Sequence, residues 1–374
     1  MVLFGEIVRR LAEDLNGKIS DSELGDPFLS SPYKVYPLQE SNFRHVKENS
    51  SRRRLAFVDG GNDVLIEAPN FSVQLVRAAL SVFDGRERVT PEHTVQRIEL
   101  LCLITTKILE GDAYYETSLF PMVEEVKPYL PDPAHLKFKS TDPRITVGGT
   151  RPGIGRVASI VRKFTEWKYA TEAVKRELKQ EDVLVMDGTL RTGFPNEQAY
   201  ASEAYRVASG KKVVYTGLSK SSRLLTTSGL SLLGAVRALA ERSSISAPWY
   251  YFPVAESSSP EHYASIMILR LNEESQRVFR YDLNADQAKN MNRGEIDEVL
   301  WKLSENACDL AFPGYPYGLV DADYNARVRS DELEAYRIGL YSEISRLGHS
   351  KFLHHMQSTD AHRVLNMLRE APYG

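Results

Sequence analysis

The sequence has very little cysteine and no long apolar segment. Its 374 residues include two cysteines, Cys102 and Cys308, which lie far apart and form no CxxC pattern. A structural zinc site is therefore not indicated, and both thiols are expected to be buried in a reducing compartment. No apolar run approaches the ~20 residues that span a bilayer. Because Glu6, Arg9 and Arg10 interrupt the first apolar stretch, it predicts an amphipathic helix rather than a signal peptide, and we expect a cytoplasmic protein.

The chain also lacks an excess of either charge and a phosphate-cradling loop. A formal net charge of −3 argues against coating nucleic acid by bulk charge, although a local basic groove stays open. The absence of GxxxxGK[ST] argues against a nucleotide-dependent phosphotransferase. With 42% hydrophobic and 26% charged residues, the composition is that of a globular protein with one large or two ordinary domains.

Two short apolar runs, at residues 55–61 and 183–189, end in the same way. Each predicts a buried strand whose last residue is an aspartate, Asp59 or Asp187, followed at once by glycine. A buried carboxylate normally needs a metal or another cation beside it, and glycine leaves room for a close approach. The two strand ends could converge at one sheet edge and hold a divalent metal. The alternative is a turn-forming Asp-Gly pair after each strand.

A third carboxylate could come from the helix predicted over residues 157–179, just before the second run. Magnesium and manganese prefer oxygen ligands, and two aspartates alone would make a sparse site. Glu166 lies at the boundary of the apolar stripe of this helix, and Glu172 and Glu177 are the other candidates. The alternative for each glutamate is an ordinary surface charge.

Three polar segments could contact phosphate. Lys220, with Ser221 and Arg223 beside it, follows the strand predicted over 212–218. Tyr315 lies in a Pro/Gly-rich turn that could display tyrosines to bases. The arginine run at 52–54 could meet a phosphate backbone. The alternatives are that the Lys220 segment is an ordinary polar loop, the Tyr315 segment is a packed turn, and the arginine run is a solvated lead-in to the first strand.

The remaining pattern predicts an α/β protein with a central mixed sheet flanked by helices. A strand, a helix and a strand follow one another within residues 183–218, which suggests a crossover unit. Asn62-Asp63 is expected to form a turn, and residues 112–155 are expected to be irregular. Further strands are predicted over 72–83, 96–109, 249–254, 264–271 and 276–282, and further helices over 196–209, 295–306, 331–347 and 361–370.

In chain order, five segments resemble the archaeal NurA family of DNA-end-processing nucleases. They are FVDGG at 57–61, RKFTEWKYA at 162–170, VLVMDGTL at 183–190, GLSKSSRL at 217–224 and GYPYGLVDAD at 314–323. The resemblance implies an RNase H-like core and manganese- or magnesium-dependent cleavage of DNA. It also implies a homodimer that encloses the substrate and a HerA-type hexameric ATPase as partner, in DNA end resection and recombinational repair.

The resemblance further implies roles for individual residues. Asp59 and Asp187 would be catalytic metal ligands, with Glu166 as the third carboxylate and Glu172 as its alternative. Lys220 would be catalytic and contact phosphate. On this basis we expect a lead-in over residues 1–50, a nuclease domain over 51–330 and a helical segment over 331–374.

The C-terminal motif adds Tyr315 as a DNA contact and shows one of two departures from the family pattern. The first motif usually reads Asp-Gly-Ser, whereas this chain has Gly61 in place of the serine. The last motif usually ends in a histidine, where Asp323 would substitute as an oxygen ligand. These departures leave open a second hypothesis, a catalytically weakened adaptor that binds DNA and regulates the ATPase.

Overall fold

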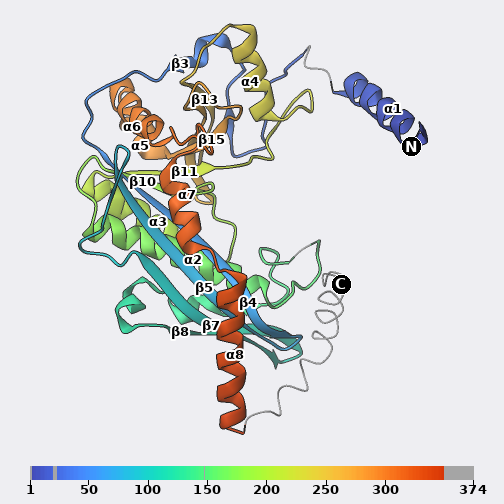
Figure 1. The fold of residues 1–374 in the computed structure, drawn as a ribbon, viewed down its shortest axis with the longest axis vertical. Helices are drawn as coiled ribbons and strands as arrows, with labels where there is room; N and C mark the ends of the chain where they lie inside the picture. The colour runs from blue at the N-terminus through green and yellow to red at the C-terminus, as the bar shows by residue number, and fades with distance from the viewer. Residues whose placement is uncertain (1, 20–22, 147, 349–374) are drawn as a thin grey trace.

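The computed structural model describes residues 2–19, 23–146 and 148–348, and its centre is one large mixed β-sheet (Figure 1). Thirteen strands of the described residues form this sheet, in the order β2-β13-β14-β15-β11-β10-β4-β5-β7-β8-β9, with β3 beside β13 and β6 beside β5. A separate two-stranded ladder joins β1 (Pro27–Phe28) to β12 (Leu225–Thr226). The strands of the large sheet are β2 (Lys34–Val35), β3 (Phe43–His45), β4 (Arg54–Ala68), β5 (Phe71–Asp84), β6 (Glu87–Val89), β7 (Arg97–Leu109), β8 (Asp112–Pro121), β9 (Phe138–Lys139), β10 (Val183–Asp187), β11 (Val214–Ser219), β13 (Trp249–Ser259), β14 (His262–Arg270) and β15 (Phe279–Asn284).

Three neighbouring strands, β4, β10 and β11, run parallel at the middle of the sheet. Val183 of β10 lies opposite Leu55 of β4 on one side and Val214 of β11 on the other. Helix α3 connects β10 to β11, which confirms the predicted crossover unit. The β4–β5, β5–β7 and β7–β8 pairs are antiparallel, so the sheet is mixed, as predicted.

Helices cover both faces of the sheet. Because side chains alternate along a strand, Ala56 and Val58 of β4 pack toward α2 and α3, whereas Leu55 and Phe57 pack toward α6 and α7. Helix α4 covers β13 and β14, and α8 lies over the far end of β4. The α-helices are α1 (Val2–Lys18), α2 (Arg156–Arg176), α3 (Glu197–Lys211), α4 (Leu232–Arg242), α5 (Ala285–Asn290), α6 (Arg293–Asn306), α7 (Tyr317–Ala326) and α8 (Ser330–Arg346); 3₁₀ turns cover Glu40–Asn42, Glu124–Tyr129 and Pro133–Leu136.

The structure corrects the predicted end of the first strand. β10 does end at Asp187, but β4 runs through Asp59 and on to Ala68, so Asp59 lies inside a strand. The turn expected at Asn62-Asp63 is wrong because β5 pairs with β4 along its length, with Asn62 opposite Val76. The chain turns only at residues 69–70.

One other prediction about local structure was wrong. Residues 112–155 were expected to be irregular, yet Asp112–Pro121 forms β8, which pairs with β7 from Leu109 to Leu100. Tertiary pairing outweighs the weak local pattern there. Helices α4, α5 and α7 were not predicted, and the helix predicted over 361–370 lies outside the described residues.

Helix α1 confirms the amphipathic helix predicted at the start of the chain, with Phe4, Ile7, Leu11 and Leu15 all exposed. Within the described part of the chain, no helix combines the length and apolar character that crossing a membrane requires.

Candidate active site

Asp59 and Asp187 lie side by side on the same face of the sheet. Met186 is opposite Val58 in the parallel β10–β4 pair, so the next residue along each strand is one of the two aspartates. Two residues earlier, Phe57 and Val185 share the core on the α7 side, and alternation along the strand points both aspartates to that side. Parallel pairing therefore places the carboxylates as neighbours at the point where β10 ends.

Glu166 reaches this point from the opposite face, past Gly60. After Asp187 the strand β10 has ended, so the edge of β4 at Gly60 is open on that side. Glu166 of α2 is 2% exposed, and a Cβ placed on Gly60 would lie 2.6 Å from its Oε1. Only glycine leaves room for this carboxylate to pass the strand, and its charge acts on the Asp59 carboxyl group.

Two cations of α2 hold Glu166. Lys163 Nζ lies 3.1 Å from Glu166 Oε2, and the Arg162 guanidinium is bonded to Oε1. Arg162 Nη1 also donates to the Gly60 carbonyl at 3.2 Å, which pairs a backbone acceptor on the open edge of β4. The negative charge of Glu166 raises the pKa of Arg162, with smaller contributions from Asp59 and Asp187. The third carboxylate is thus buried but paired.

Asp187 is surrounded by Lys220, Tyr315 and Asp323 on the face of the sheet that α7 covers. Lys220 Nζ lies 3.2 Å from Asp187 Oδ2 and 3.4 Å from Asp323 Oδ1. Tyr315 donates its hydroxyl to Asp187 Oδ1 at 3.2 Å, and Lys220 Nζ stands 5.6 Å from the centre of its ring. Arg327 pairs with the other oxygen of Asp323 at 3.0 Å. This face therefore brings together a strand end, the loop after β11 and helix α7.

Asp59 is the least compensated group of the cluster. Burial, together with the charges of Asp187 and Glu166, raises the pKa of Asp59 to about 8, against the opposing effect of Lys220. Its carboxylate accepts a hydrogen bond from the Gly60 amide, at 2.7 Å. Burial and the Asp187 carboxylate raise the pKa of the Tyr315 hydroxyl, so Tyr315 stays a hydrogen-bond donor. Additional positive charge at Asp59 would stabilise the cluster.

The donors fit a hard divalent cation by type, although their arrangement is one of ion pairs. Carboxylate oxygens of Asp59, Asp187, Glu166 and Asp323 are the ligands that magnesium and manganese prefer. Across residues 2–19, 23–146 and 148–348, however, no three His, Cys, Asp or Glu side chains are already grouped as metal ligands. Instead, Glu166 is paired with Arg162 and Lys163, and Asp187 is paired with Lys220.

Several residues predicted for the site lie outside this cluster. Glu172 is bonded to Lys175 at 2.8 Å and to Arg176 at 2.9 Å, further along α2. Ser221 and Arg223 are exposed in the loop after β11. In the run at 52–54, Arg53 pairs with Glu298 and Arg54 with Asp182, so these two arginines stabilise the fold.

Sequence reasoning anticipated a close approach at the glycine after Asp59, which Glu166 makes at Gly60, but it did not single out Arg162 and Lys163. The available signal was their spacing, because Arg162 and Lys163 precede Glu166 by four and three residues, where helix side chains meet.

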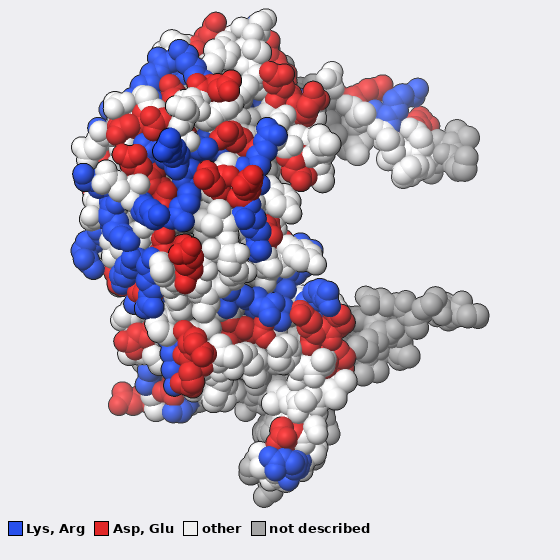
Figure 2. All heavy atoms as spheres, turned by 60° about the vertical axis from the view of Figure 1, so that its left-hand side comes forward, with Lys and Arg blue, Asp and Glu red and all other residues white. Residues whose placement is uncertain are grey.

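Figure 2 shows acidic and basic side chains interspersed over one face of the molecule. On this face, recognition of a charged ligand would therefore depend on local groups rather than on a single-sign surface.

Comparisons with known proteins agree with the fold. The sequence matches the family model of the NurA domain over residues 53–328, and no curated protein sequence matches it. The structure is similar to the NurA nuclease from Sulfolobus solfataricus, with TM-score 0.50, 13% identity and coverage of 91% of this chain and 94% of that chain. The catalytic domain of human endonuclease V gives TM-score 0.33 at 15% identity, with 80% and 92% covered, and Ciona intestinalis endonuclease V bound to DNA gives 0.36 at 9%, with 76% and 87% covered. The predicted RNase H-like α/β core is confirmed.

Proposed function

This chain belongs to the NurA family of nucleases, and from that premise we propose that it is a manganese- or magnesium-dependent deoxyribonuclease. The observation that supports this most directly is the in-register placement of Asp59 and Asp187 on adjacent parallel strands. Glu166 joins them past Gly60. Three neighbouring carboxylates, of which Asp59 and Glu166 are buried, cost free energy unless a cation compensates them. The raised pKa of Asp59 indicates that the neighbouring side chains compensate only in part.

Asp59, Asp187, Glu166 and Asp323 are the residues that would hold the metal. When bound, a divalent metal supplies activation of water for attack at phosphorus and neutralises charge on the phosphate. The side-chain cations that are paired with these carboxylates in the structure would then be available to bind other negatively charged groups.

The residues of this chain would complete the site. Lys220 bridges Asp187 and Asp323, and its ammonium is placed to donate to a phosphate oxygen and stabilise charge that develops there. Tyr315 orients Asp187 by donating to its Oδ1. Arg162 and Lys163 set the direction of Glu166. Each of these interactions fixes a carboxylate before substrate binds.

Family membership also supports the wider proposal. We propose DNA ends and single strands as substrate, a homodimer, and a HerA-type hexameric ATPase as partner in end resection and recombinational repair in the cytoplasm. Residues 51–330 would form the nuclease domain, since the family match covers nearly the same range.

The test is degradation of labelled linear DNA in the presence of manganese. The Asp59→Ala, Asp187→Ala double variant should lose activity, because both strands then lack their carboxylate. Asp63→Ala is the matched control, since Asp63 is an exposed aspartate on the same strand. Equal degradation by wild type and double variant would refute the proposal.

A second candidate is a DNA-binding adaptor that regulates the ATPase. It is favoured by the ion pairs of Lys220 with Asp187 and Asp323, and by Gly61 and Asp323 in place of the usual family residues. Calorimetric titration with manganese separates the two. A nuclease should show binding heat that disappears in the double variant, whereas an adaptor should show none that depends on Asp59 and Asp187.

A further inference from the structure

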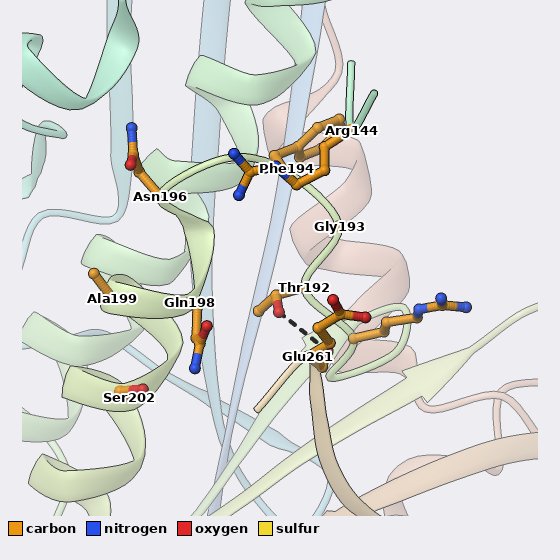
Figure 3. Close-up of a pocket in the computed structure, with 10 residues that line it drawn as sticks. Arg144, Thr192, Gly193, Phe194, Asn196, Gln198, Ala199, Ser202 and Glu261 are labelled. Carbon is orange, nitrogen blue, oxygen red and sulfur yellow. Dashed lines mark hydrogen bonds between the residues drawn. The ribbon is translucent and has the colours of Figure 1, made fainter. Parts of the chain in front are cut away.

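A polar pocket lies directly beside the loop that follows Asp187. Its volume is about 630 Å³, and it lies between the loop over residues 188–196, the start of α3, Arg144 and Glu261 (Figure 3). Figure 3 shows Arg144 beside Phe194 at one end of the pocket and Gln198 and Ser202 along α3. The carboxylate cluster described above does not include any of these residues.

The loop is held in place by groups from three other elements. Leu190 N donates to the buried Asp282 of β15 at 3.1 Å. Thr192 donates its amide, at 2.7 Å, and its hydroxyl, at 3.0 Å, to the Glu261 carbonyl. Glu197, 1% exposed, accepts from the amides of residues 193 and 194 at 2.7 and 3.0 Å. A loop bonded in this way presents its side chains in one geometry, which reduces the entropy cost of binding.

Close packing against β11 also fixes the position of the loop over residues 188–196. A Cβ on Gly217 would lie 2.5 Å from the Gly188 carbonyl, so the loop crosses β11 where that strand has no side chain. Asp282, opposite Gly217 in the sheet, is itself fixed by Arg280 at 2.8 Å and His262 at 2.7 Å. The pocket wall therefore packs against β11, the strand that also pairs with β10 at Asp187.

The pocket chemistry suits a phosphodiester strand. Among the side chains that line it, Arg144 and Arg191 are positive and Glu261 is negative, while Asn196 and Gln198 are neutral hydrogen-bonding amides. Arg144 uses two of its nitrogens on Asp142, at 3.2 and 2.9 Å, which leaves further donors of its planar guanidinium for a phosphate. Both lining arginines are exposed.

The pocket is within a few nucleotides of the carboxylates. Arg191 follows Asp187 by four positions, and an extended chain spans at most ~3.6 Å per residue, or about 14 Å over this distance. At about 3.4 Å per nucleotide along a stacked strand, that distance corresponds to roughly four nucleotides. Arg191 is therefore near enough to Asp187 for one bound strand to contact both.

We propose that the pocket is a binding subsite for single-stranded DNA, in which Arg144 and Arg191 contact backbone phosphate. Phe194 and the amides of Asn196 and Gln198 would then face the sugar and base of the same nucleotide. This inference rests on the proposed function, because it takes the strand in the pocket to be the continuation of the one cleaved at the carboxylate cluster.

The test measures binding of a labelled 12-nucleotide DNA strand by fluorescence anisotropy, in EDTA so that no cleavage occurs. We expect the Arg144→Ala, Arg191→Ala double variant to bind about tenfold more weakly. The slope of log affinity against log salt should fall in magnitude by roughly 0.7 for each phosphate that an arginine no longer neutralises. Glu261→Gln should bind more tightly than wild type, because it removes a negative charge and keeps the backbone carbonyl that anchors Thr192.

Arg293→Ala is the matched control, since Arg293 is an exposed arginine on α6, outside the pocket and the cluster. Wild-type affinity and salt slope in the double variant, at an unchanged unfolding temperature, would overturn the subsite. Because binding is measured without metal, that result leaves the nuclease proposal standing. Conversely, a wild-type protein that binds the strand through these arginines but cleaves no DNA with manganese or magnesium would contradict the nuclease proposal alone.

Discussion

The carbonyl oxygen of Ala326, at the end of α7, lies so close to Gly61 that a Cβ on residue 61 would stand 2.5 Å from it. The presence of glycine instead of the usual serine at position 61 therefore agrees with the close packing of α7 against this residue. In this chain the end of α7 occupies the space that a serine side chain at position 61 would need, and α7 also carries Asp323 into the site.

Gly61→Ser should therefore destabilise the protein or displace α7. We expect a loss of about 1–3 kcal/mol in the free energy of unfolding, as for other overpacked sites, measured by chemical denaturation. Gly339→Ala is the control, because a Cβ at this position in α8 meets nothing within 4 Å, and alanine in a helix should stabilise by up to about 1 kcal/mol. Equal stability of Gly61→Ser and wild type would show that α7 does not depend on this glycine.

Two glutamates of α2 offer a matched pair for identifying the third carboxylate. Glu166 and Glu172 are both buried, and each is bonded to two cations of the same helix. We expect Glu166→Gln to lower DNA cleavage by about 100-fold or more, because its charge acts on the Asp59 cluster. Glu172→Gln should leave cleavage close to wild type. The measurement is the initial rate of DNA degradation under saturating manganese, and a reversed order would assign the role to Glu172.

If Asp187 and Asp323 hold a divalent cation as proposed, Lys220 would compete with it, because it is paired with both carboxylates. Lys220→Met should therefore bind manganese more tightly than wild type in calorimetric titration, since both carboxylates lose their ammonium partner. The same variant should cleave DNA roughly 100-fold more slowly, because it lacks the ammonium group that we propose stabilises charge developing on the phosphate. Lys168→Met is the control, as Lys168 pairs with Glu203 away from the cluster. Weaker manganese binding by Lys220→Met would contradict this competition.

Asp282 predicts a specific pH dependence of stability. Although burial raises it, the charge of Arg280 and the hydrogen bond of His262 lower the pKa of Asp282 from 3.8 to about 2. A carboxylate with a lowered pKa in the folded state stabilises fully above the unfolded value, and that contribution disappears as the pH falls through the folded pKa. The contribution, roughly 2 kcal/mol, should therefore decline between about pH 5 and about pH 2.

Urea denaturation of wild type and Asp282→Asn checks this expectation. The difference in unfolding free energy between the two proteins should be largest near about pH 6 and should shrink toward about pH 3. A difference that stays constant over this range would show that the charge of Asp282 is not what stabilises the fold.

Local sequence patterns predicted the strands and helices that alternate strongly, and they placed Asp187 at a strand end. They failed for Asp59, because nothing in Asp-Gly-Gly indicates that β5 continues to pair beyond it. Glycines usually weaken a strand. Here Gly60 and Gly61 lie where Glu166 and Ala326 approach from opposite faces, which only the tertiary structure reveals.

The choice between Glu166 and Glu172 also depends on tertiary structure. Periodicity placed Glu166 at the boundary of the apolar stripe, but it left Glu172 as an alternative because both are glutamates of the same helix. What distinguishes Glu166 is the open edge of β4 beside it, created where β10 stops. Strand β8 was missed for a related reason, since its partner β7 and not its own sequence determines it.

Asp59 lies inside β4, which pairs with β5 both before and after it, and this has a consequence for where the site tolerates insertions and deletions. Inserting one residue into β4 before Asp59 would move Asp59 to the opposite face of the sheet, because side chains alternate with a period of two. Length changes after Asp187 would instead alter only the loop over residues 188–196. Sequence divergence that preserves the carboxylate pair is thus restricted along β4 and within β10 up to Asp187, and is permitted after Asp187.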